Sequence, residues 1–244
     1  SLGFRSVDID RTLNKISSYP DLIRGIKCRA SHVITGDLGV YAVRVAKKVA
    51  RIAGLPLIVH VGEPPPLFEE VLENLEEGDV VTHAFHGKPG GNLMEDSKSL
   101  DAVKDAKERG VLMDVGHGAA SFSFEVMQFA LDQGIKADII STDLHQNNVQ
   151  GPVFDLPTTL SKLLNLGMSL EEVIKAGSNR PAGFLFPDEN ESDFLKIGNM
   201  ADFTVFTLEA SDEDVQDSQG VSLKLKKIIR PKLAVQGIHH EECL

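Results

Sequence analysis

Ionisable side chains stand at or just past the ends of five apolar runs in this sequence. They are Lys27, His60, His83, His117 and Asp143. Imidazoles offer neutral nitrogen ligands to zinc and a carboxylate offers an anionic oxygen, so these residue types suit a hydrolytic metal centre without thiolates. A single histidine at a strand end is more often a half-buried structural residue, and we interpret the remaining isolated examples that way: His32, His239 and His240.

The elements that must position these side chains follow from the hydrophobic pattern. Short runs rich in Val and Ile alternate with longer amphipathic stretches, which is typical of repeated βα units around a parallel sheet. We expect strands at 22–29, 55–61, 80–85, 111–115 and 138–142. We expect helices at 41–52, 67–75, 100–109, 124–133, 158–166 and 170–176. A glycine follows each predicted helix, and Asp155 and Ser169 are good N-caps, which supports these boundaries.

The carboxyl ends of parallel strands meet at one edge of a sheet, where α/β proteins build their sites. If the five strands are neighbours, the ionisable residues at their ends converge there. Packing alone does not explain such a set, because a buried imidazole or charge is costly unless it is paired or bound to a metal. The sequence therefore predicts a metal site at this edge, with Lys27 as an unusual member.

The sequence pattern changes after Pro187. A polar stretch at 188–193 precedes short alternating runs at 195–210 and 221–238. These runs indicate a second, smaller β element. We therefore predict two domains, a partial barrel at 1–187 and a β domain at 188–244.

Composition excludes several classes of protein. The chain has 244 residues, of which 42% are hydrophobic and 25% charged, as in ordinary globular proteins. No apolar run is long enough for a membrane helix, and a net charge of −11 argues against binding nucleic acid. We expect a small-molecule partner and no nucleic-acid or membrane partner, and assembly into a homo-oligomer stays open. Cys28 and Cys243 fit no disulfide framework, which favours a reducing, cytoplasmic location.

Five segments together resemble the amidohydrolase superfamily, specifically its dihydroorotase-like amidohydrolase/deacetylase metallohydrolases. The segments are GIKCRAS, VHVGEPP, VVTHAFHGK, DVGHGAASFSF and STDLH. The match runs from about Ile23 to Asn179. The resemblance implies an α/β fold, a TIM (β/α)8 barrel with a small β-sandwich, and two divalent metal ions, with zinc as the expected metal.

The resemblance also implies roles for individual residues. Lys27 would react with CO₂ to give a carbamate that bridges the two ions. His60 and His83 would be ligands of the second metal. Asp143 would be a ligand of the first metal and the catalytic residue that accepts a proton from the bridging water. Carbamylation makes chemical sense, because it turns a cation into an anionic ligand.

Residues of the surrounding loops are candidates for binding the substrate. His117, with Gly118 beside it, could hydrogen-bond the substrate or could instead be a structural histidine. Glu63, His86 and His145 belong to loops at the same carboxyl edge of the predicted sheet and are predicted substrate contacts. The segment HGKPGGN, at 86–92, is interpreted as a rim loop rather than a phosphate cradle.

One motif of the superfamily is absent. Its opening pair of histidines, separated by one residue on strand 1, has no counterpart here, and the chain opens with Ser1. A complete barrel takes roughly 250 residues, whereas only five strands precede the tail. We therefore expect strands 4–8 of the barrel and the C-terminal part of the sandwich, with the first strands missing.

The leading functional hypothesis is a binuclear hydrolase that cleaves a C–N or ester bond of a small acylated substrate, as a deacetylase does. A dihydroorotase or other cyclic amidase is the alternative. It is less favoured because a dihydroorotase needs a cationic residue to hold the substrate carboxylate, and no arginine stands clearly at the predicted strand ends. Arg29, two residues after Lys27, is the nearest candidate. A third alternative is a non-catalytic scaffold, if the first strands are truly absent.

Overall fold

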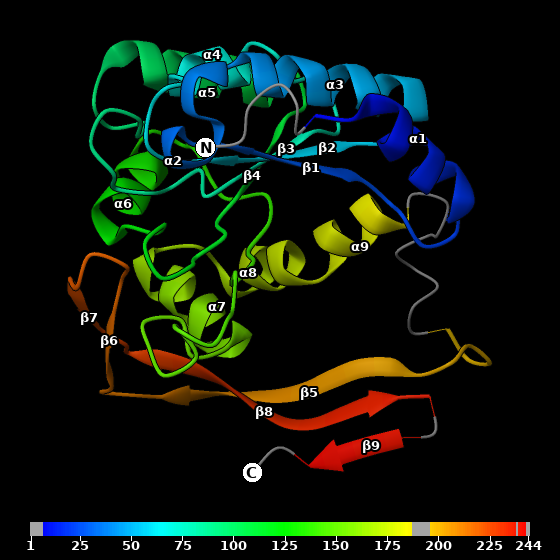
Figure 1. Cartoon of the computed structure of the whole chain (residues 1–244). Coiled ribbons are helices and arrows are strands. Elements are labelled where there is room, and N and C mark those ends of the chain that lie inside the picture. The colour runs from blue at the N-terminus through cyan, green and yellow to red at the C-terminus, as the bar shows by residue number, and fades with distance from the viewer. Residues whose placement is uncertain (1–6, 187–195, 238, 243–244) are drawn as a thin grey trace. The chain divides into compact units, whose positions relative to one another are not determined.

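The computed structural model of the chain describes residues 7–186, 196–237 and 239–242 (Figure 1). Two compact units divide the chain. The first contains the residues up to Gly116 together with 120–138, and the second contains 117–119 and the residues from Ile139 onward. These compact units are defined by contacts and do not test the predicted domain boundary between 187 and 188. That boundary stays a prediction.

The first unit is built on a parallel sheet, as predicted. Its strands lie in the order β1-β2-β3-β4 and pair in parallel with their neighbours. Their bounds are β1 (Ile26–Ala30), β2 (Leu57–Val61), β3 (Val80–Thr82) and β4 (Leu112–Asp114). The predicted start of the first strand at residue 22 was wrong, because the amides of Leu22 and Ile23 donate to the Tyr19 carbonyl in a turn.

The predicted strand at 138–142 does not join the sheet. Its backbone hydrogen bonds are divided between two segments: Met113 and His117–Gly118, in and just after β4, and Ala176 at the end of α8. A strand needs a continuous ladder with one neighbour, and this segment has none. The expectation of five sheet strands is therefore corrected to four in the described part of the chain.

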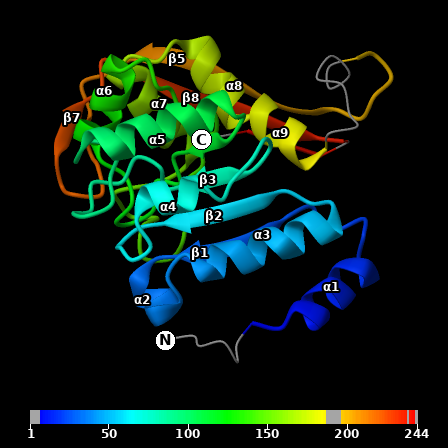
Figure 2. The same cartoon turned by 90° about the horizontal axis from the view of Figure 1, so that it is seen from above.

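The helices of the first unit lie largely on one side of its sheet. In Figure 1, α3, α4 and α5 lie above the strands, and Figure 2 shows α3 running alongside β1 and β2, which it contacts. The bounds are α1 (Ile9–Ser18), α2 (His32–Thr35), the 3-10 turn η2 (Gly36–Leu38), α3 (Tyr41–Ala53), α4 (Phe68–Leu72), α5 (Ser97–Glu108) and α6 (Phe124–Asp132). The predicted helices at 41–52, 67–75, 100–109 and 124–133 correspond to α3, α4, α5 and α6.

The second unit combines three helices with antiparallel strands. Its helices are α7 (Leu156–Leu166), α8 (Leu170–Gly177) and α9 (Asn179–Leu185). A three-stranded sheet has the order β5-β8-β9, and a two-stranded hairpin joins β6 and β7. The strands are β5 (Asp202–Ala210), β6 (Asp214–Gln216), β7 (Ser222–Lys224), β8 (Lys227–Gln236) and β9 (His239–Glu242). The prediction of a β element after residue 187 is confirmed.

Both predicted N-caps are present in the second unit. The Asp155 carboxylate accepts a hydrogen bond from the Thr158 amide at 2.6 Å, at the start of α7. Ser169 and Glu172 form a capping box at the start of α8. Each cap satisfies amides that the first helical turn leaves without a backbone partner. The sequence signals for these two helix starts were therefore correct.

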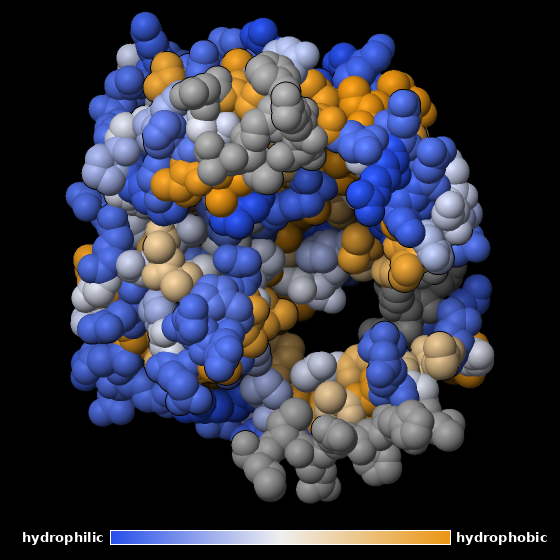
Figure 3. All heavy atoms as spheres, viewed as in Figure 1, coloured by the Kyte–Doolittle hydropathy of each residue, from blue (hydrophilic) through white to orange (hydrophobic). Residues whose placement is uncertain are grey.

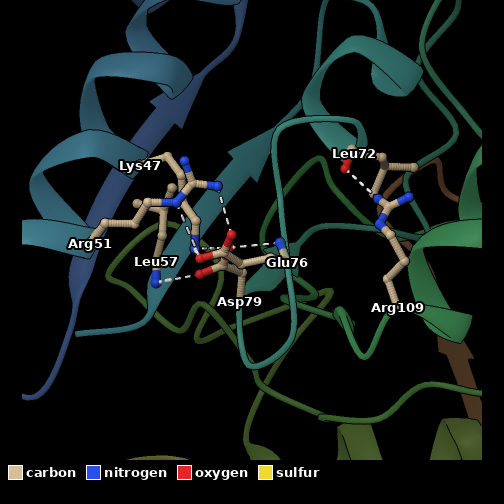
Figure 4. Close-up of polar contacts among 7 residues, drawn as sticks. All are labelled: Lys47, Arg51, Leu57, Leu72, Glu76, Asp79 and Arg109. Atoms are coloured by element: carbon tan, nitrogen blue, oxygen red, sulfur yellow. Dashed lines mark hydrogen bonds and ion pairs between the residues drawn. The ribbon is translucent and has the colours of Figure 1, made fainter. Parts of the chain in front are cut away.

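An ion-pair network with a buried centre, Lys47 and Asp79, lies at the amino edge of the first unit's sheet (Figure 4). Lys47 Nζ is 2.5 Å from Asp79 Oδ2 and 2.8 Å from Glu76 Oε1. Asp79 also accepts a hydrogen bond from the Leu57 amide, and Glu76 pairs with Arg51 at 2.6 Å. The network ties α3 to the starts of β2 and β3. In parallel α/β folds this edge serves stability, whereas the opposite edge carries the chemistry.

Charged and polar residues are prominent on the surface. On the face drawn in Figure 3, hydrophilic residues cover much of each unit, with smaller hydrophobic patches between them. Among the described residues, no helix is long and apolar enough to cross a membrane.

Candidate functional site

A row of polar residues crosses the carboxyl edge of the first unit's sheet. Arg29 is paired in register with His60, His60 with Thr82, and Thr82 with Asp114. Paired residues on neighbouring parallel strands point to the same face, so the four side chains share one side of the sheet. Of the residues predicted to converge at this edge, the row contains His60; the convergence of the whole predicted set stays a prediction.

Lys27 lies on the same face as this row. In β1, Lys27 and Arg29 are exposed, whereas Cys28 and Ala30 are buried. Because alternate residues of a strand point to opposite faces, Lys27 and Arg29 point away from the buried side that α3 covers. The structure therefore places Lys27 and His60 on neighbouring strands and on one face.

His60 and His83 form a close pair. Their ring centroids lie 4.4 Å apart, with an angle of 79° between the ring planes. His83 follows β3 directly and has a φ of 67°. A positive φ is uncommon for a residue with a side chain, and such backbone strain concentrates at functional sites. The strained turn directs the His83 ring toward His60.

The tautomer of His83 follows from its hydrogen bond. Its Nδ1 lies 2.5 Å from the Gly116 carbonyl oxygen. A carbonyl can only accept, so Nδ1 carries the hydrogen and Nε2 keeps a lone pair. Metal-binding histidines are typically oriented in this way, by a hydrogen bond from the other ring nitrogen.

Gly116 leaves no room for a side chain beside His83. It has a φ of 48°. A Cβ at this position would lie 2.3 Å from Thr82 Oγ1 and 2.8 Å from His83 Nδ1. The close approach of the Gly116 carbonyl to His83 therefore requires glycine.

Positive neighbours and burial keep His60 uncharged. Burial is the main cause that lowers the pKa of His60 to about 3, and His83, Arg29 and Lys27 lower it further. The neutral imidazole is the form that binds a metal ion.

Two predicted substrate contacts, Glu63 and His86, lie in loops around this pair. Glu63 forms an ion pair with Lys88 at 2.9 Å. Burial by itself would raise the pKa of Glu63, but its hydrogen bond with Lys88 contributes to a net lowering. His86 is buried, and its Nδ1 accepts a hydrogen bond from the Lys88 amide. Burial is the main reason that the pKa of His86 falls to about 4.

Asp143 belongs to the second unit, where it is exposed and has a φ of 47°. Asn148, which is fully buried, donates a hydrogen bond from Nδ2 to the Asp143 carbonyl at 3.0 Å. The Asn148 side chain also accepts from the amide of His145, which is exposed. Asn148 was not among the predicted residues, because an asparagine in a polar loop carries no signal of burial.

His117 is held inside the second unit and is fully buried. Its Nδ1 donates to the Gly118 carbonyl at 3.0 Å, and its Nε2 accepts from Lys162 at 2.8 Å. Burial first, and then Lys162, lower the pKa of His117 to about 4. Substrate binding by His117 and Gly118 remains a prediction. Lys162 was missed, although a lysine among the leucines of the predicted helix TTLSKLLNL was an available signal.

The predicted metal ligands are thus partly assembled. His60 and His83 are adjacent, Lys27 shares the sheet face of His60, and Asp143 lies in the other unit. Within the described residues, no three His, Cys, Asp or Glu side chains cluster closely enough to hold a metal ion. A lysine becomes a metal ligand only when its amine is made anionic, and two histidines with such a lysine fit the donor set of a hydrolytic centre.

The second unit contains a cavity of about 510 Å³. It is lined by residues from the loop at 150–154 and from the β6–β7 hairpin. Asp143, the predicted catalytic residue, does not line this cavity.

Known proteins resemble this chain closely over most of its length. A deacetylase of Brucella anthropi is 45% identical over 234 residues, which cover 96% of this chain and 58% of that protein. A deacetylase of Agrobacterium fabrum is also 45% identical over 234 residues, covering 96% of this chain and 57% of that protein. No protein-family model matches the chain. The chain thus spans little more than half the length of these curated relatives.

A solved structure shows the same fold. A crystal structure of a dihydroorotase has a TM-score of 0.95 and 43% sequence identity, and the match covers 99% of this chain and 62% of that one. The chain therefore shares its fold with a protein named dihydroorotase, and the sequence motifs resemble dihydroorotase-like proteins.

Proposed function

We propose that this chain is part of a metal-dependent amidohydrolase that cleaves a C–N or ester bond of a small acylated compound, as a deacetylase does. The central observation is the His60–His83 pair, in which the Gly116 carbonyl sets the tautomer of His83. The similarity to deacetylases of two bacteria supports the same activity. A small molecule is the proposed partner.

The observed parallel sheet is compatible with a more specific fold, part of a barrel. We propose that β1–β4 and the segment 138–142 correspond to strands 4–8 of a (β/α)8 barrel, and that the β5-β8-β9 sheet is the C-terminal part of a β-sandwich. The close likeness to a structure of which this chain covers 62% supports this reading.

In the proposed metal centre, His60 and His83 would each bind through a ring nitrogen, and Lys27 would bind as a carbamate. Two divalent ions, with zinc as the expected metal, would make water nucleophilic near neutral pH and polarise the substrate carbonyl. Asp143 would accept the proton of the attacking water at a carboxylate oxygen and return it to the leaving nitrogen or oxygen. Glu63, His86, His117, Gly118 and His145 would bind or orient the substrate.

Cyclic-amide hydrolysis is a second candidate, which one structural observation favours. Arg29 is paired in register with His60 and lies on the same face of the sheet. A guanidinium there could hold the carboxylate of a dihydroorotate-like substrate in a bidentate pair. An Arg29→Met variant would lose activity on carboxylated cyclic amides but keep its activity on uncharged acetyl compounds.

The test is to measure metal content and hydrolysis in the full-length protein. We expect one to two equivalents of a divalent ion per chain and hydrolysis of N-acetyl or O-acetyl compounds. The His60→Ala/His83→Ala variant should lose both. A folded wild-type protein that binds less than about one ion per several chains and hydrolyses none of these compounds would instead support a scaffold role.

A further inference from the structure

We propose that Lys162 is a positioning residue for Asp143, acting through the backbone of His117 and Gly118. The inference rests on the proposed function, in which Asp143 transfers the proton. All the contacts that carry it lie within the second unit.

Lys162 joins three segments from inside the unit. It lies on α7 and is fully buried. Its ammonium group contacts His117 Nε2 at 2.8 Å, the Pro152 carbonyl at 2.5 Å and the Gln216 carbonyl at 2.8 Å. An ammonium has three N–H donors, so one side chain can satisfy all three acceptors. These bonds fix the His117 ring relative to α7.

The His117–Gly118 backbone in turn holds the chain that leads to Asp143. The His117 amide donates to the Ser141 carbonyl at 3.1 Å, and the Gly118 amide donates to the Thr142 carbonyl at 2.9 Å. Ser141 and Thr142 directly precede Asp143. The path from Lys162 to Asp143 therefore runs through one side-chain contact and two adjacent backbone hydrogen bonds.

Asp143 needs such support because of its backbone conformation. Its φ of 47° lies in the left-handed region, which is unfavourable for most residues other than glycine. Surrounding contacts have to hold this conformation. The Asn148 side chain bonds to the Asp143 carbonyl on one side, and the His117–Gly118 backbone bonds to the preceding residues on the other.

The burial of Lys162 is hard to explain by stability alone. Desolvation is the main cause that lowers its pKa to about 8, which is opposed by Asp217 and Asp155. Apolar residues of similar volume often replace buried charges without loss of stability. A lysine here provides what an apolar side chain cannot, namely three directed hydrogen bonds to separate segments.

The test compares Lys162→Met with Asn165→Leu in the full-length, metal-loaded protein. Asn165 lies one turn further along α7 and ties that helix to the chain at Lys226 and Lys227 instead. We expect Lys162→Met to lower kcat and kcat/KM together by roughly 10- to 100-fold with little change in KM, because misplacement of a catalytic group acts in the transition state. Asn165→Leu should lower stability but keep kcat.

Hydrogen exchange gives a readout that does not depend on activity. In Lys162→Met, the amides of His117 and Gly118 should exchange faster relative to the rest of the unit, whereas Asn165→Leu should leave their relative protection unchanged. Lys162→Gln keeps two N–H donors. Its kcat and the exchange rates of the His117 and Gly118 amides should lie between those of the wild type and of Lys162→Met. This variant replaces Lys162→Met in the test if the Met variant does not fold.

Two results separate the two proposals. If Lys162→Met and Lys162→Gln fold with wild-type kcat and unchanged protection of the His117 and Gly118 amides, the positioning role is wrong although the hydrolase remains. If the wild-type protein has no hydrolase activity, the proposed function fails. Faster exchange at the His117 and Gly118 amides would then show only that Lys162 supports the Asp143 loop. A role of Lys162 in catalysis would be overturned as well.

Discussion

Gly116 is the residue at which a single added carbon would most directly disturb the predicted site. Its Cβ would overlap Thr82 Oγ1 and crowd His83 Nδ1, and its φ is positive. We expect Gly116→Ala to lower the free energy of unfolding by roughly 1–3 kcal/mol. We also expect it to weaken metal binding by roughly 10- to 100-fold, since the hydrogen bond that orients His83 would be displaced.

The matched control for this change is Gly134→Ala. Gly134 also has a positive φ, 77°, but its Cβ would meet nothing within 4 Å. Denaturant unfolding and a metal titration of both variants separate backbone strain from displacement of His83. Equal metal affinity in the two variants would contradict the role assigned to Gly116.

Asp143 is the residue on which the proposed proton transfer depends. Asp143→Asn keeps the size of the side chain but removes its basic oxygen, so the fold should survive. We expect kcat to fall roughly 10²- to 10⁴-fold, the usual contribution of a general base. Steady-state kinetics with a melting curve as the folding control measure this. Turnover at the wild-type rate would refute the assigned role.

Among the elements, the junction of α3 with the starts of β2 and β3 makes stability depend on pH. The hydrogen bond from Arg51, followed by that from Lys47, lowers the pKa of Glu76 to about 2. The unfolded value is near 4.3, so the ionised carboxylate stabilises the fold above about pH 4.3 and this contribution is lost as the pH falls toward 2. Half of the Glu76 side chain is exposed, so solvent screening limits the effect to about 1 kcal/mol.

Glu76→Gln tests this expectation. The variant should be less stable than wild type at pH 7, and the difference should shrink as the pH falls from about 4.5 toward 2. Urea unfolding at a series of pH values measures it. Glu73→Gln, an exposed neighbour in the same segment, supplies the baseline. A difference that stays constant down to pH 2 would show that the carboxylate contributes through shape and not through charge.

At the scale of the whole molecule, the proposed metal centre predicts that stability is coupled to metal binding. A ligand that binds only the folded state at about 100 times its Kd adds about 2.7 kcal/mol. For a protein of this size that corresponds to a rise in Tm of roughly 5–10 °C. Thermal unfolding with zinc, and again after chelation, measures it. The same rise in the His60→Ala/His83→Ala variant would place the bound metal elsewhere.

Local sequence patterns determined most of the elements and the identity of the candidate residues. Alternating apolar runs and caps such as Asp155 and Ser169 act over a few residues, so four of the predicted strands and the main helices could be recognised without a structure. The end of an apolar strand is likewise a local feature, which is why His60 and His83 stood out. Lys27 stood out for the same reason, but β1 begins at Ile26, so Lys27 is the second residue of that strand and not its end.

Only the tertiary structure decided how these residues are supported. The Gly116 carbonyl that sets the His83 tautomer is 33 positions away, and Lys162 is 45 positions from His117. The sequence pattern of 138–142 predicts a strand, yet its hydrogen bonds are divided between the stretch after β4 and Ala176. Contacts of this kind depend on where distant loops pass one another in space, and no pattern of neighbouring residues encodes that.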